Sequence, residues 1–169
     1  MRFYGFGNYY LSSLQQGLQA GHAAVDLHVK YNILEQGQFD VQPCRDAYND
    51  WAANHKTMVL LNGGNSADLQ ELFDFLYCEE NPYPFVKFHE DEVSLNGALT
   101  YVGMILPPEI YDTSAKMRMI RSYDYNPDRN LLCFYPKVQG ADVLLIEEVM
   151  LSPFQFALCE RLNQYGLAK

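Results

Sequence analysis

The stretch RFYGFGNYYLSSLQQGLQAGHAAVDLHVKY, residues 2–31, decides the fold of this chain. Its short aromatic start predicts a strand, and the pattern beyond the glycine-containing bend predicts a helix that runs to Tyr31. Polar side chains recur along this helix at steps of four, three and four residues and form one stripe: Gln15, Gln19, His22 and Asp26. A polar stripe with an imidazole at a strand-to-helix junction is a common ligand position in α/β proteins, so we expect a site here.

The same helix has a second, largely apolar face, marked by Leu11, Leu14, Leu18 and Val25, with small residues where another element could pack closely: Ala20, Gly21 and Ala24. Its start is marked by Ser12 and Ser13, because a glutamine follows each of them three residues later, the spacing of a capping box.

Composition limits the classes of partner. The 169 residues suit one domain with an appendage, and 12 basic against 21 acidic side chains give a net charge of -9. This charge argues against a tRNA or other nucleic-acid partner, whose binding depends on phosphate contacts. The four cysteines form no C-x-x-C pair, and neither an export signal nor an apolar run of ~20 residues is visible. We therefore expect a cytoplasmic protein with free thiols and no membrane partner.

The rest of the first hundred residues continues an α/β pattern. We expect helices and strands alternating over these ranges: a helix at 45–54, a strand at 56–62, a helix from 66 to 78 capped by Ser66, and strands at 82–88 and 98–106. Together with the first strand they predict a mixed four-stranded sheet with helices on both faces.

The pattern restarts after Pro108. A helix at 109–120 should be followed by a hairpin of strands 131–136 and 142–149, and Ser152-Pro153 should open a last helix over 154–165. We therefore divide the chain into an α/β core, residues 1–108, and an α+β C-terminal extension, residues 109–169, packed on that core.

The order of these elements resembles the type II peptidyl-tRNA hydrolase family. That family has a first helix with a glutamine, two spacers and His-Ala, and here LQAGHAA offers Gln19, His22 and Ala23. DWAANHKTMVLLN, SADLQELFDFL and NGALTYVGMILPP then follow in the family's order, so the resemblance covers roughly residues 2–108. It implies the fold and, where its site residues are kept, hydrolysis of peptidyl-tRNA.

The chain departs from the family at several site positions. Gln15 stands where the family has a lysine, and a neutral amide cannot supply its charge. Phe88 occupies the aligned position of the family's acid, which Glu90 or Asp91 could replace only if the loop shifts. Gln19, His22 and Thr100 are what survives of the family's site.

Other features could complete a ligand site. Paired amides suit nucleobase edges, tyrosines can stack on a base, and the NGGNS turn at 62–66 could present backbone N–H groups to an anion. The expected ligand-binding set is Tyr9, Gln15, Gln19, His22, Asn62, Asn65 and Thr100. A structural interpretation stays open for each, with His22 bonded to Asp26 or Gln19 and the turn serving only as a turn.

Two functions follow from these observations. The first is a non-enzymatic binding protein for a small polar, nucleotide-like ligand, similar to small phage-encoded proteins that sequester host cyclic-nucleotide signals. The alternative is a diverged peptidyl-tRNA hydrolase, an esterase in which His22 and a displaced acid, Asp91 or Glu90, carry the reaction. Neither function requires a cofactor, and the histidines are not spaced as metal ligands. The sequence leaves a homo-oligomer open.

Overall fold

A computed structural model describes residues 1–34, 41–91, 93, 96–136 and 146–168. The chain divides into two compact units. The first contains the residues up to Pro107 together with the chain end from Tyr165, and the second runs from Pro108 to Gln164. The division after Pro107 lies one residue before the expected boundary, but the chain end belongs to the first unit and not to the extension in which we placed it.

The first unit is built on a mixed four-stranded sheet, which confirms the expected α/β class. Its strands are β1 (Arg2–Gly7), β2 (Met58–Asn62), β3 (Phe85–His89) and β4 (Leu99–Leu106). They lie in the order β2-β1-β4-β3, with β1 parallel to β2 and β4 antiparallel to both of its neighbours. The chain end covers the outer side of β2 through a bridge between Leu61 and Leu167.

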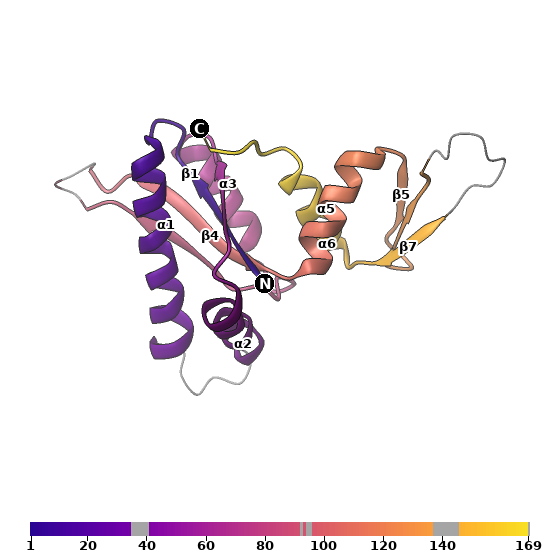
Figure 1. The fold of residues 1–169 in the computed structure, drawn as a ribbon, viewed down its shortest axis with the longest axis horizontal. Coiled ribbons are helices and arrows are strands. Elements are labelled where there is room, and N and C mark those ends of the chain that lie inside the picture. Colours follow the sequence, from indigo (N-terminus) through magenta and orange to yellow (C-terminus); the bar gives the residue numbers. More distant parts are fainter. Residues whose placement is uncertain (35–40, 92, 94–95, 137–145, 169) are drawn as a thin grey trace. The chain divides into compact units, whose positions relative to one another are not determined.

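Helices cover both faces of this sheet (Figure 1). They are α1 (Ser13–His28), which continues as a π-helical segment (Val29–Leu34), α2 (Gln42–Asp50), which continues as a second π-helical segment (Trp51–His55), and α3 (Ser66–Leu76). Phe3 packs with residues of α1 and α2 in one core, whereas Phe6 and Leu69 of α3 both crowd Gly63. Since side chains three apart on a strand point to opposite faces, α1 and α3 lie on opposite sides of the sheet.

Glycines in the strands bring α1 close to the sheet. A Cβ atom added at Gly103 would lie 2.8 Å from the Phe3 ring and 3.2 Å from Ala23 of α1. The Tyr101 hydroxyl occupies the space that a side chain at Gly5 would need. The missing side chain at Gly103 thus lets Ala23 of α1 lie close to the sheet, and the missing side chain at Gly5 makes space for the Tyr101 side chain.

The largely apolar face of the first helix does not pack on the sheet. Of the four residues that mark this face, only Leu11 is buried, and Leu14, Leu18 and Val25 are 76%, 56% and 61% exposed. The side that faces the sheet instead contains two glutamines, two alanines and one leucine: Gln16, Gln19, Ala20, Ala23 and Leu27. A large side chain would not fit at Ala23, where the helix lies directly over Gly103.

Local capping patterns were predicted more accurately. Ser12 caps α1 in a capping box with Gln15, as expected. The cap of α3 is Asn65, paired with Asp68, and not Ser66 as we expected. The Ser66 hydroxyl donates to the Leu99 carbonyl instead, at 2.8 Å.

The second unit combines two helices with a three-stranded antiparallel sheet. Its elements are α5 (Pro108–Ile120), β5 (Tyr123–Asn126), β6 (Leu131–Phe134), β7 (Glu147–Met150) and α6 (Pro153–Leu162). The expected hairpin is confirmed by the pairing of β6 with β7, although residues 137–145 lie outside the described part. β5, which we did not predict, pairs with the other side of β6, and Ser152 caps α6 as expected. Among the described helices of both units, none is long and apolar enough to cross a bilayer.

The close approach of α1 to the sheet can be tested with two glycine substitutions. Gly103→Ala should lower the free energy of unfolding by about 1–3 kcal/mol because the new Cβ meets the buried Phe3 ring. Gly17→Ala is the control, since a Cβ there meets nothing, and it should raise stability by up to about 1 kcal/mol. Chemical unfolding measures both, and a Gly103→Ala variant as stable as the wild type would contradict this packing.

Candidate functional site

Three residues that are far apart in the sequence meet beside α1. The side-chain amide of Gln19 donates to a carboxylate oxygen of Glu90, just after β3, and its carbonyl oxygen accepts a long hydrogen bond of 3.5 Å from the Thr100 hydroxyl on β4. Gln19 is 6% exposed and Thr100 is fully buried. The structure thus brings together two expected ligand residues, and the carboxylate of Glu90 contacts one of them, Gln19.

His22 lies one helical turn from Gln19 and is exposed. Its imidazole stacks on the Phe88 ring with centroids 4.8 Å apart and planes 6° from parallel. Asp26, one turn further along, has a raised pKa because partial burial disfavours its charged form, while the charge of His22 acts in the opposite direction. We refer to Gln19, His22, Phe88, Glu90 and Thr100 as the α1–β3 cluster.

Three other residues of the expected ligand-binding set serve in local structure. The Gln15 carbonyl oxygen accepts from the backbone N–H of Ser12 in the capping box. Asn62 accepts from the backbone N–H of Gly64 at 3.0 Å, and Asn65 accepts from two backbone N–H groups at the start of α3. Their side-chain oxygens therefore already stabilise turns and helix ends.

Tyr9 lies at the bend between β1 and α1. It is 64% exposed, and its ring meets that of Tyr10 edge to face. Its backbone N–H donates to the carbonyl of Gly64, which joins this bend to the turn after β2. Tyr9 therefore lies near the turn that contains Asn62 and Asn65.

Below α1 lies a buried polar layer that the sequence did not predict. The Gln16 amide donates to the Asn8 carbonyl at 2.9 Å, and the Asn8 amide donates to the Ser66 hydroxyl at 3.1 Å. Among the described residues, the remaining side-chain oxygens of Asn8 and Gln16 and the Tyr101 hydroxyl have no hydrogen-bond partner. Burial also raises the pKa of Tyr101 far above its usual value, so its hydroxyl stays neutral.

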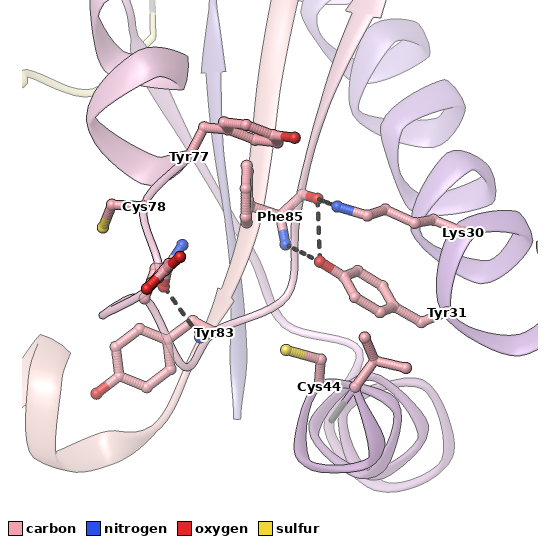
Figure 2. Close-up of a pocket in the computed structure, with 10 residues that line it drawn as sticks. Lys30, Tyr31, Cys44, Tyr77, Cys78, Tyr83 and Phe85 are labelled. Atoms are coloured by element: carbon pink, nitrogen blue, oxygen red, sulfur yellow. Dashed lines mark hydrogen bonds between the residues drawn. The ribbon is translucent and has the colours of Figure 1, made fainter. Parts of the chain in front are cut away.

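A pocket at the other end of α1 was also missed. It has a volume of about 620 Å³ and is lined by residues of four segments: Lys30, Tyr31, Val41, Cys44, Tyr77, Cys78, Glu79, Asn81, Tyr83 and Phe85. Figure 2 shows their side chains around the start of β3. We call it the Lys30 pocket.

Lys30 is held at the wall of this pocket by several contacts. Its ammonium lies 4.8 Å from the centroid of the Tyr31 ring and 4.5 Å from that of Phe85, and it donates to the Phe85 carbonyl at 3.4 Å. The Tyr31 hydroxyl accepts from the Phe85 N–H at 3.2 Å (Figure 2). Both Lys30 and Tyr31 belong to the π-helical segment that extends α1, a backbone form often found at functional sites.

Two further observations concern the chemistry available. Within the described residues, no three histidine, cysteine or acidic side chains are grouped as metal ligands would be. Neither a known protein family nor a curated protein matches the chain. The residues themselves are therefore the basis for a functional proposal.

The hydrogen bonds of Gln19 can be tested through stability. Gln19→Ala would leave the buried Thr100 hydroxyl and the Glu90 carboxylate without this partner, and should lower the free energy of unfolding by about 1–3 kcal/mol. Gln15→Ala, on the exposed side of the same helix, is the matched control and should cost less than about 1 kcal/mol. Equal losses for the two variants in urea unfolding would contradict the contact between Gln19 and the sheet.

Proposed function

We propose that this protein binds a small nucleotide-like ligand in the Lys30 pocket and does not transform it. One observation carries the proposal: the Lys30 ammonium is fixed beside two aromatic rings at the wall of a pocket with further exposed aromatic surface. A nucleotide combines a flat base with an anionic group, and this pocket offers a partner for each.

The aromatic walls suit a base. Tyr77 is 73% exposed, and its ring stacks on Phe73 and meets Phe85 edge to face, which fixes its position. Base stacking on such rings contributes about 1–3 kcal/mol per base without requiring a particular base. The volume of about 620 Å³ also lies in the range of roughly 300–1,000 Å³ that small-molecule sites occupy.

The charges of the pocket favour a ligand with one negative charge. Among its ten lining residues Lys30 is the single basic side chain, and Glu79 is acidic. A polyphosphate would meet one cation, one carboxylate and the field of a chain with a net charge of -9. A cyclic mononucleotide carries a single negative charge and therefore suits this pocket better than a polyphosphate does. Such a ligand agrees with the role expected from the sequence, the sequestering of a cyclic-nucleotide signal.

Binding of cyclic nucleotides can be measured by calorimetry with 3′,5′-cyclic AMP and cyclic GMP. We expect Lys30→Gln to weaken binding about tenfold or more, because a hydrogen bond from a charged donor to the ligand is lost. Tyr77→Ala should weaken binding by a similar factor through lost stacking. Adenosine, which has no charged group, should bind wild type and Lys30→Gln equally.

Lys56→Gln provides the matched control, because Lys56 is an exposed lysine of the same unit outside this pocket. It should bind as the wild type does. No binding of either cyclic nucleotide by the wild type, or equal affinity of Lys30→Gln and wild type, would refute the proposal.

The second candidate is a diverged peptidyl-tRNA hydrolase acting through the α1–β3 cluster. The specific observation in its favour is that the Glu90 carboxylate accepts a hydrogen bond from Gln19, one of the three residues that the family resemblance retains. His22, exposed and stacked on Phe88, would then act as the proton-transferring group. Against it stand the missing lysine at Gln15 and the acidic charge of the chain.

A turnover assay separates the two functions because they use different ends of α1. We expect no release of peptide from peptidyl-tRNA above the level seen with His22→Ala. His28→Ala, which changes another exposed histidine of α1, is the control. Turnover lost in His22→Ala and Glu90→Gln but kept in His28→Ala would establish the hydrolase instead.

A further inference from the structure

We propose that the Lys30 pocket selects a guanine base and that Glu79 makes this selection. The selection rests on the proposed function, since it concerns the base of the ligand that the pocket binds. Among the ten residues that line the pocket, Glu79 is the one with an acidic side chain.

Two polar side chains of the pocket wall already bind the backbone. The Tyr31 hydroxyl accepts from the Phe85 N–H at 3.2 Å and donates to the Phe85 carbonyl at 3.4 Å. The Cys44 thiol donates to the Pro82 carbonyl at 3.4 Å. These hydrogen bonds hold the wall in place, so neither group is the one that distinguishes between bases.

Asn81, the side-chain amide among the lining residues, is also engaged. Its nitrogen donates to the Leu76 carbonyl at 2.8 Å, and its oxygen accepts from the Tyr83 N–H at 3.0 Å. An asparagine amide is a common partner for adenine, to which it forms two hydrogen bonds. Because both ends of the Asn81 amide hold the loop after α3, the pocket wall does not offer adenine this partner.

Glu79 offers a different hydrogen-bonding pattern. Its side chain is exposed, and within the described part of the chain its carboxylate forms neither a hydrogen bond nor an ion pair. An ionised carboxylate only accepts hydrogen bonds, and it does so with two neighbouring oxygens. The ligand group that matches it best therefore carries two neighbouring N–H donors.

Guanine is the base that has this pair of donors. Its Watson–Crick edge presents N1–H beside the 2-amino group, so one carboxylate can accept from both. Adenine presents the acceptor N1 beside its amino group, and this nitrogen would face a carboxylate oxygen without a proton between them. Cytosine and uracil also place an acceptor next to each donor. The carboxylate of Glu79 therefore favours guanine over the other three bases.

The loop after α3 keeps Glu79 close to the Tyr77 ring. The Asn81 N–H donates to the Cys78 carbonyl at 3.2 Å, which places Glu79 inside a turn. The Tyr77 ring is held by its contacts with Phe73 and Phe85. Two residues of chain span at most about 7 Å, so the edge of a base stacked on Tyr77 lies within reach of the Glu79 side chain.

Glu79 and Lys30 belong to different sides of the pocket. Figure 2 shows Lys30 and Cys78, the neighbour of Glu79, on opposite sides of Phe85. A nucleotide likewise carries its phosphate and the Watson–Crick edge of its base at opposite ends. The phosphate can then bind Lys30 without approaching the carboxylate that binds the base.

Calorimetry with three 3′,5′-cyclic nucleotides tests this selection. We expect the wild type to bind cyclic GMP about tenfold or more tightly than cyclic AMP, the discrimination typical of a bidentate pair. Cyclic IMP, which keeps N1–H but lacks the 2-amino group, should have an affinity between these two. Glu79→Gln should weaken binding of cyclic GMP about tenfold and should not weaken binding of cyclic AMP, because an amide can donate to adenine N1.

Glu80→Gln is the matched control, because it removes the same charge from the next residue, which does not line the pocket. It should keep the preference for cyclic GMP, and circular dichroism checks that both variants are folded. Three results would overturn the guanine selection and leave the proposed function standing: equal affinities of the wild type for cyclic GMP and cyclic AMP, tighter binding of cyclic AMP, or a guanine preference that persists in Glu79→Gln. If the wild type binds none of the three nucleotides, the proposed function fails and the selection fails with it.

Discussion

The close approach of α1 to a glycine-containing sheet is the constraint on which the first unit depends. Gly5 and Gly103 remove side chains where the helix crosses the strands, and Tyr101 fills the space above Gly5 with its hydroxyl. The facing side of α1 must then be small or able to form hydrogen bonds with buried polar groups. This explains why Gln16, Gln19, Ala20 and Ala23 face inward, whereas Leu14 and Leu18 of the same helix are exposed.

Features set by local interactions could be predicted from the sequence. The capping serines Ser12 and Ser152 act within one turn of their helices, so their spacing alone was sufficient. The side of α1 that faces the sheet could not be predicted in this way, because it depends on where glycines of the strands, such as Gly103 opposite Ala23, let the helix approach. The chain end on β2 also escaped prediction, since nothing local distinguishes residues after α6 from a tail.

The two candidate sites, the α1–β3 cluster and the Lys30 pocket, also differ in how far they could be predicted from the sequence. The family resemblance named Gln19 and Thr100 together, and their side chains are hydrogen-bonded in the structure, whereas the contact of Gln19 with Glu90 depends on the loop after β3 and had no signal in the sequence. The Lys30 pocket combines residues of common types from four segments that are far apart in the sequence, so no spacing in the sequence marks it. The one local signal was Lys30-Tyr31 at the end of a long helix, where the backbone widens into a π-helical segment.

Both sites depend on the same two elements. Helix α1 contributes Gln19 and His22 to the α1–β3 cluster and, through its π-helical extension, Lys30 to the pocket. Strand β3 begins with Phe85 in the pocket and leads to Phe88 and Glu90 in the cluster. A small shift of α1 along β3 would therefore change both sites together, since packed elements move as bodies.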